Sequence, residues 1–93
     1  QHPDHRSAHI ALGDMHYYRG DLEQASARYQ LALSQAGTGP ERSAMNLRLG
    51  EIDLRRHDVT AARARFQAAL RDDPRLAASV EALEKESRVS RGP

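Results

Sequence analysis

Residues 12–33 read LGDMHYYRGDLEQASARYQLAL, and residues 49–70, which lie 37 positions further along, read LGEIDLRRHDVTAARARFQAAL. Among the positions that keep the same residue type are, in the first stretch, Leu12, Gly13, Arg19, Asp21, Ala25, Arg28, Gln30, Ala32 and Leu33. Self-similarity at a period of a few tens of residues is typical of a solenoid, in which each repeat buries its apolar face against its neighbours. The sequence therefore predicts stacked copies of one structural unit.

Each copy has the pattern of two helices joined by a short turn. The chain is rich in Ala, Leu, Arg, Glu and Gln and has almost no runs of β-branched residues that would form strands. Turn residues and prolines divide it into five expected helices, at 4–18, 21–35, 41–56, 59–71 and 75–88. Asp21 with Gln24 is expected to cap the second helix, and Asp58 the fourth. The predicted fold class is all-α.

The order of the repeated residues resembles the tetratricopeptide repeat, a helix-turn-helix unit of 34 residues. The matching landmarks are Leu12-Gly13, Gly20-Asp21, Ala25 with Tyr29 and Ala32-Leu33 in the first copy, and Leu49-Gly50, His57-Asp58, Ala62 with Phe66, Ala69-Leu70 and Pro74 in the second. The resemblance implies a single domain over residues 1–93, with one repeat at about 6–39, a second at about 43–74 and a capping helix at about 75–88. It also implies a solenoid of antiparallel helix pairs in a right-handed superhelical array.

Two features depart from this pattern. Large aromatic residues of the family are replaced by His9 and His16 in the first copy and by Asn46 and Asp53 in the second. The first period is also three residues longer, and the extra residues fall at 37–39, where Gly-Thr-Gly is expected to form a flexible insertion.

Gly13 and Gly50 lie in the middle of expected helices, where glycine costs about 1 kcal/mol relative to alanine. Close approach of the paired helix compensates for this cost if Ala25 and Ala62 stand opposite the glycines, with aromatic rings filling the gap one turn further on. A larger residue in place of either glycine is expected to push the helices apart.

The last helix, at 75–88, lacks the landmarks of the repeat. Its apolar residues Leu76, Val80 and Leu83 are expected to cover the end of the second repeat, as a capping helix does. Pro3 lies 37 residues before Pro40, in phase with the repeat, and the chain is therefore expected to be a piece of a longer protein.

Neither a metal site nor a catalytic site is expected. His5, His9 and His16 lie on one stripe of the first helix and could in principle bind a transition metal, but the favoured interpretation is that the last two pack between helices in place of aromatics. A role of this stripe in pH sensing stays open. No nucleophile motif, phosphate-binding loop or cofactor fingerprint is present, so neither enzymatic activity nor a cofactor is expected.

Composition excludes several classes of partner. The 14 Lys and Arg residues nearly balance the 13 Asp and Glu residues, which leaves a net charge of +1 and no dense basic stripe for nucleic acid. Arg63, Arg65 and Arg71 are expected to form a solvated outer face. No segment has the apolar length of a membrane span. The absence of cysteine is compatible with cytoplasm and periplasm alike, with the cytoplasm slightly favoured.

The resemblance points to a binding groove, because the first helix of each tetratricopeptide repeat lines the concave surface of the array. The candidate groove residues are Ile10, Asp14, Tyr17 and Tyr18 on the first helix and Leu47, Glu51, Leu54 and Arg55 on the third. The alternative is that Ile10, Tyr17, Leu47 and Leu54 merely pack one helix against the next.

These residues also indicate the kind of partner. Chaperone-binding members of the family hold a terminal carboxylate with Lys and Asn, whereas this chain carries Ile10, Leu47, Asp14 and Glu51 at the equivalent places. An acidic carboxyl-terminal tail is therefore not expected to bind. We expect instead that a segment with apolar anchors and a Lys or Arg binds. The predicted function is a non-enzymatic interaction module. The alternative is a structural spacer whose parent protein carries its functional site elsewhere.

Overall fold

The computed structural model describes residues 5–90, with side chains up to Arg88. The elements in chain order are α1 (His5–Arg19), α2 (Leu22–Ser34), α3 (Gly39–Arg55), α4 (Val59–Asp72), the short 3-10 helix η1 (Pro74–Leu76) and α5 (Ala77–Ser90). Within these described residues there is no strand, so the prediction of an all-α fold is confirmed. Each of the five expected helices is present, with ends within two residues of their predicted places.

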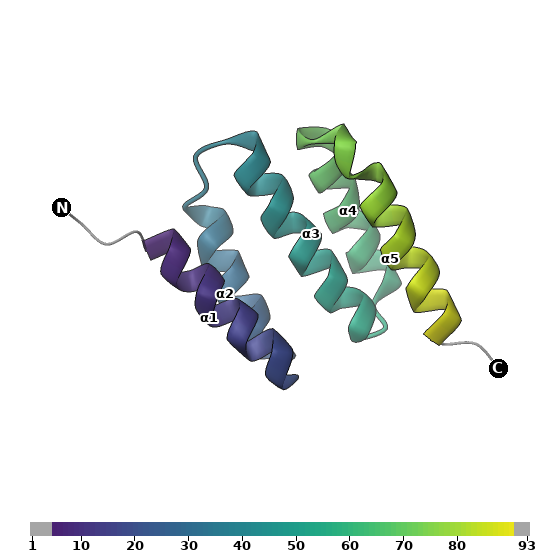
Figure 1. Cartoon of the computed structure of the whole chain (residues 1–93), viewed down its shortest axis with the longest axis horizontal. Helices are drawn as coiled ribbons and strands as arrows, with labels where there is room; N and C mark the ends of the chain where they lie inside the picture. The colour runs from purple at the N-terminus through teal and green to yellow at the C-terminus, as the bar shows by residue number, and fades with distance from the viewer. Residues whose placement is uncertain (1–4, 91–93) are drawn as a thin grey trace.

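The helices are arranged in two layers. Figure 1 shows α1, α3 and α5 side by side in the layer nearer the viewer, with α2 and α4 behind them. The closest packing is within the pairs α1–α2 and α3–α4, and α2 also packs against α3 of the following pair. The molecule is elongated along the stacking direction, with principal extents of 53 × 29 × 17 Å.

Both helix pairs turn back through the same backbone conformation. Gly20 has a φ of +84°, and His57, which stands at the equivalent place in the second copy, has a φ of +64°. Glycine adopts this left-handed region without steric penalty, whereas a residue with a side chain does so at some cost. The second turn therefore keeps the geometry of the first although it has lost the glycine.

The helix starts differ from expectation at two places. Asp58 caps α4 as predicted, since its carboxylate accepts from the Ala61 amide at 3.1 Å. Asp21 makes no such bond at the start of α2, so the predicted capping box there is wrong. Its carboxylate lies instead 3.7 Å from Nδ1 of His16, on the other side of the turn.

Residues 37–38 lie in the loop between the helix pairs as expected, but the prediction of a flexible insertion at 37–39 is corrected in one respect, because Thr38 is the N-cap of α3 and Gly39 is its first residue. Thr38 accepts from the Glu41 amide at 3.3 Å, while the Glu41 carboxylate accepts from the amides of Gly37 at 2.7 Å and Thr38 at 3.2 Å. This reciprocal capping box satisfies backbone donors at the start of α3. These bonds also hold the pKa of the Glu41 carboxyl below its ordinary value.

The core consists of two apolar clusters that share helix α3. The first joins α2 to α3 and contains Ala25, Tyr29, Ala32, Met45, Leu49 and Ile52. The second joins α3, α4 and α5 and contains Leu54, Ala62, Phe66 and Val80, with Leu83 packed against it. Val80 is only 6% exposed, so α5 buries part of its own apolar face against the second helix pair.

Both mid-helix glycines face an aromatic ring. A Cβ atom built on Gly13 would lie 2.6 Å from Cε1 of Tyr29, and one built on Gly50 would lie 2.5 Å from Cε1 of Phe66. The predicted close approach of the paired helices is therefore present. The partner differs from expectation, because the nearest atoms belong to these rings and not to Ala25 and Ala62.

Candidate functional site

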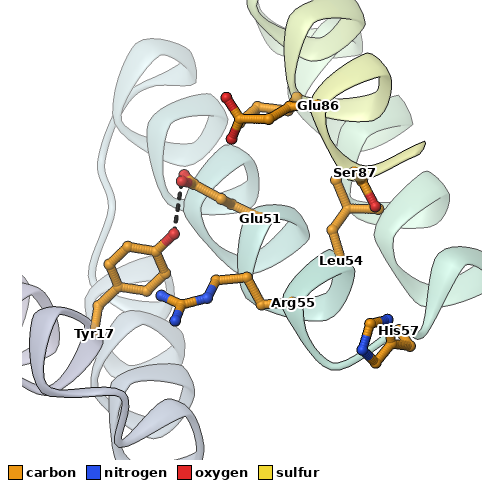
Figure 2. A pocket seen from close by; sticks show the side chains of 8 residues that line it. Tyr17, Glu51, Leu54, Arg55, His57, Glu86 and Ser87 are labelled. Carbon is orange, nitrogen blue, oxygen red and sulfur yellow. Dashed lines mark hydrogen bonds between the residues drawn. The ribbon is translucent and has the colours of Figure 1, made fainter. Parts of the chain in front are cut away.

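A groove of about 270 Å³ opens on the face shared by α1, α3 and α5. Figure 2 shows it from close by, with α3 carrying one wall and α5 the other. Its lining residues are Tyr17 from α1, Glu51, Leu54 and Arg55 from α3, His57 from the following turn, and Leu83, Glu86 and Ser87 from α5. The groove thus combines an apolar base with charged side chains from both walls.

One side of the groove is organised around Tyr17. Its hydroxyl donates a hydrogen bond to Oε2 of Glu51 at 2.7 Å, and Cζ of Arg55 lies 4.9 Å from the centroid of its ring. Tyr18 meets the same ring edge-on at 5.7 Å between centroids and is itself 85% exposed. Burial, reinforced by the bond to Glu51, raises the pKa of the Tyr17 hydroxyl above its ordinary value.

A second cluster lies next to it and joins α1 to α3 through Asp14. The carboxylate of Asp14 accepts from the Tyr29 hydroxyl and from Nη1 of Arg48, the latter at 2.6 Å. The Arg48 guanidinium also lies over the Tyr29 ring, 5.5 Å from its centroid. Asp14 is therefore already paired with a cation of the chain itself, which the sequence did not indicate.

The candidate groove residues lie in three places. Tyr17, Glu51, Leu54 and Arg55 come together in the groove, and Asp14 and Tyr18 border the adjoining hollow of about 80 Å³ that Tyr17 and Glu51 also line. Ile10 packs against the first core cluster and Leu47 against the second, and Leu54 is only 8% exposed. The alternative of helix-to-helix packing therefore applies in large part to Ile10, Leu47 and Leu54.

Several site residues were missed from the sequence. Leu83, Glu86 and Ser87 were assigned only to a covering helix, yet they form a wall of the groove. Arg48 was missed as well, because the position that corresponds to Asp14 in the second copy is Glu51 and not Arg48.

His9 and Asn46, which stand where the tetratricopeptide pattern has aromatic residues, form polar links between paired helices. Nη1 of Arg28 lies 3.3 Å from Nδ1 of His9, and in the second copy Nη1 of Arg65 donates to Oδ1 of Asn46 at 3.2 Å. Both arginines are half-buried, so Arg65 does not belong to the fully solvated face expected for it.

His9 and His16 are half-buried too, in agreement with the favoured interpretation of the histidine stripe. Among residues with described side chains, no three His, Cys, Asp or Glu groups come together as a metal site requires.

Because Tyr29 is buried, the free energy of unfolding is expected to change with pH in the alkaline range. Burial and the bond to Asp14 raise the pKa of its hydroxyl well above its ordinary value. The folded state then holds a proton that the unfolded state loses above about pH 10, so this contribution to stability is complete below about pH 10 and falls as the pH rises further. We expect Tyr29→Phe to reduce the loss of unfolding free energy between about pH 10 and about pH 12, measured by urea unfolding. Tyr18→Phe is the control, and an equal loss in the unmodified chain and in Tyr29→Phe would contradict the assignment.

No family model, curated protein or solved structure matches the chain. None of the helices in the described part combines the length and the apolar character needed to cross a membrane. Function is therefore inferred from the groove and its side chains.

Proposed function

We propose that this chain is a tetratricopeptide-like module of two repeats and a capping helix, which binds a protein segment in the groove and has no catalytic activity of its own. The observation that carries this proposal is the groove between α3 and α5, with Tyr17 of α1 at its side. Helices α1, α3 and α5 lie in one layer, as the concave-face helices of such an array would (Figure 1). The internal repeat and the aromatic rings packed on Gly13 and Gly50 support the same relationship.

The groove favours a segment that carries an apolar side chain next to a basic one. Leu54 and Leu83 supply apolar surface, and the carboxylates of Glu51 and Glu86 enter from opposite walls, as Figure 2 shows. Carboxylates at a groove attract basic partners and repel acidic ones, which affects both the rate of association and specificity. An acidic carboxyl-terminal tail would meet like charges here.

Affinity is expected to be weak. A volume of about 270 Å³ is at the lower end for a ligand pocket, and only a few side chains of a bound segment fit into it. Because so few contacts can form, we expect dissociation constants on the order of micromolar or weaker.

Titration with matched peptides tests the proposal. A basic-apolar peptide and an acidic-tail peptide of equal length are added to the isotopically labelled chain, and backbone amide shifts are followed by NMR. We expect the basic-apolar peptide to shift resonances of groove residues, and the double variant Glu51→Lys, Glu86→Lys to reverse the preference. Glu23→Lys with Glu81→Lys is the control of equal charge, since both of these residues are exposed and neither lines the groove. If the unmodified chain binds the acidic peptide more tightly, the proposal is wrong.

The second candidate function is a structural spacer. It is favoured by the burial of Leu54 and by the packing of Ile10 and Leu47 against the core clusters, which leaves less apolar surface for a partner. A spacer would show no groove shifts with either peptide at millimolar concentration.

A further inference from the structure

The molecule contains one complete cluster made of a tyrosine, a carboxylate and an arginine. In this cluster Tyr29 donates to Asp14, Arg48 donates to the same carboxylate at 2.6 Å, and the guanidinium lies 5.5 Å from the centroid of the tyrosine ring. The carboxylate is satisfied by both partners, and the cation gains the ion pair and the ring face together. The chain itself thus pairs a carboxylate that accepts from a tyrosine with an arginine side chain.

A second cluster, of Tyr17, Glu51 and Arg55, borders the groove, but in it no ion pair joins the carboxylate to an arginine whose side chain is described. Tyr17 donates to Glu51 at 2.7 Å and Arg55 lies over the tyrosine ring, as in the first cluster. Glu51 differs from Asp14 because no ion pair joins it to any Lys, Arg or His of the described residues. Its carboxylate lies at the groove and has only the neutral tyrosine hydroxyl as a partner within the described part of the chain.

The opposite wall supplies a second carboxylate without a cation. Glu86 of α5 is exposed, lines the groove and makes no ion pair with the residues that the structure describes. Figure 2 shows both carboxylates directed into the same space. Leu83, which is half-buried, lies in the same groove and offers apolar contact to the methylene stem of a long basic side chain.

We propose that the groove binds an arginine side chain of the partner segment, whose guanidinium pairs with Glu51 and Glu86 and gives Glu51 the ion pair that Arg48 gives Asp14. Arginine fits better than lysine, because its planar guanidinium presents several N–H donors in a fixed fork and can donate to two carboxylates at once. This inference rests on the proposed function and adds the residue type that the groove selects.

The test uses four capped peptides with the sequence Ala-Leu-Xaa-Leu-Ala, where Xaa is arginine, lysine, glutamate or citrulline, the neutral isostere of arginine. Binding is followed by amide shifts of groove residues in the full chain. We expect the arginine peptide to bind best and the citrulline peptide to bind about tenfold more weakly, because the isostere keeps shape and loses charge. Equal or stronger binding of the lysine peptide would remove the preference for guanidinium.

Variants that replace a carboxylate by a neutral amide show where the arginine side chain binds. Glu51→Gln and Glu86→Gln are each expected to weaken arginine-peptide binding several-fold and to reduce the discrimination against citrulline. The amide introduced by Glu51→Gln keeps a carbonyl oxygen that can accept the Tyr17 bond, and Glu86 is exposed, so both variants are expected to fold. Glu81→Gln is the control, because this exposed residue lies on α5 outside the groove.

The outcomes separate the two proposals. If the arginine and citrulline peptides shift the groove resonances with equal affinity, the arginine site is wrong and a peptide-binding groove stands. If no peptide shifts those resonances, or if shifts occur only on other faces, both are wrong. If Glu81→Gln weakens binding as much as Glu51→Gln does, the loss of affinity comes from the net charge of the chain, and the proposed pairing of arginine with Glu51 is wrong.

Discussion

Replacing Gly50 by alanine is expected to destabilise the protein, although alanine is the better helix former by about 1 kcal/mol. The added Cβ would lie 2.5 Å from Cε1, 2.8 Å from Cδ1 and 3.0 Å from Cζ of Phe66. The ring cannot retreat freely, since it is buried in the second core cluster with Leu54, Ala62 and Val80. Overpacking of this kind costs about 1–3 kcal/mol, so the net effect is a loss of stability. We expect the melting temperature to fall by about 4–8 °C for each kcal/mol lost.

Two comparisons make this prediction specific. Gly39→Ala is the control, because the nearest atom to a Cβ there is 3.7 Å away, which is ordinary contact, and no loss is expected. Phe66→Leu in the Gly50→Ala background should cost less than Phe66→Leu alone, because the smaller side chain makes room for the new methyl group. A melting temperature that rises in Gly50→Ala would contradict the close approach.

The helix boundaries could be predicted because local residues determine them. Prolines at 40 and 74 and the turns at 20–21 and 57–58 interrupt the helical pattern irrespective of tertiary context. The start of α3 was predictable by the same means, since Thr38 followed by Glu41 is the signature of a capping box. Thr38 lies among the three extra residues of the first period, and this segment was therefore interpreted as an insertion.

The groove could be predicted only in part, because its shape depends on how consecutive helix pairs stack. The stripe that contains Tyr17, Glu51 and Arg55 follows from helical spacing within α1 and α3. The ion pair between Asp14 and Arg48 depends on the angle between the two pairs, which a side-chain stripe does not specify. The contribution of Glu86 depends on where α5 comes to rest against α3.

The side chains that face Gly13 and Gly50 could not be predicted from the sequence, for a similar reason. A small residue in a helix indicates close approach, but the contacting atoms depend on the crossing geometry and on the ring orientation of the partner helix. Tyr29 is further oriented by its bond to Asp14, which comes from another helix.

Ending the chain after Pro74 is expected to unfold the remaining residues or to cause their aggregation. The truncation removes Val80 and Leu83 from the second core cluster and exposes the side of Leu54 and Phe66 that they cover. Burial of one Val or Leu side chain contributes about 1.5–3 kcal/mol, a large part of the stability of a small domain. Chemical unfolding and the oligomeric state in solution measure the effect.

Point variants on α5 separate this covering role from its role in the groove. Val80→Ser should cost about 2 kcal/mol, because it removes a buried apolar side chain from the cluster, whereas Ala82→Ser on the exposed side should change stability by no more than about 0.5 kcal/mol. Glu86→Gln should leave the melt unchanged and weaken only peptide binding. A truncated chain that stays monomeric with an unchanged melt would show that the second helix pair is stable without α5, and the groove would then lose a wall without any loss of fold.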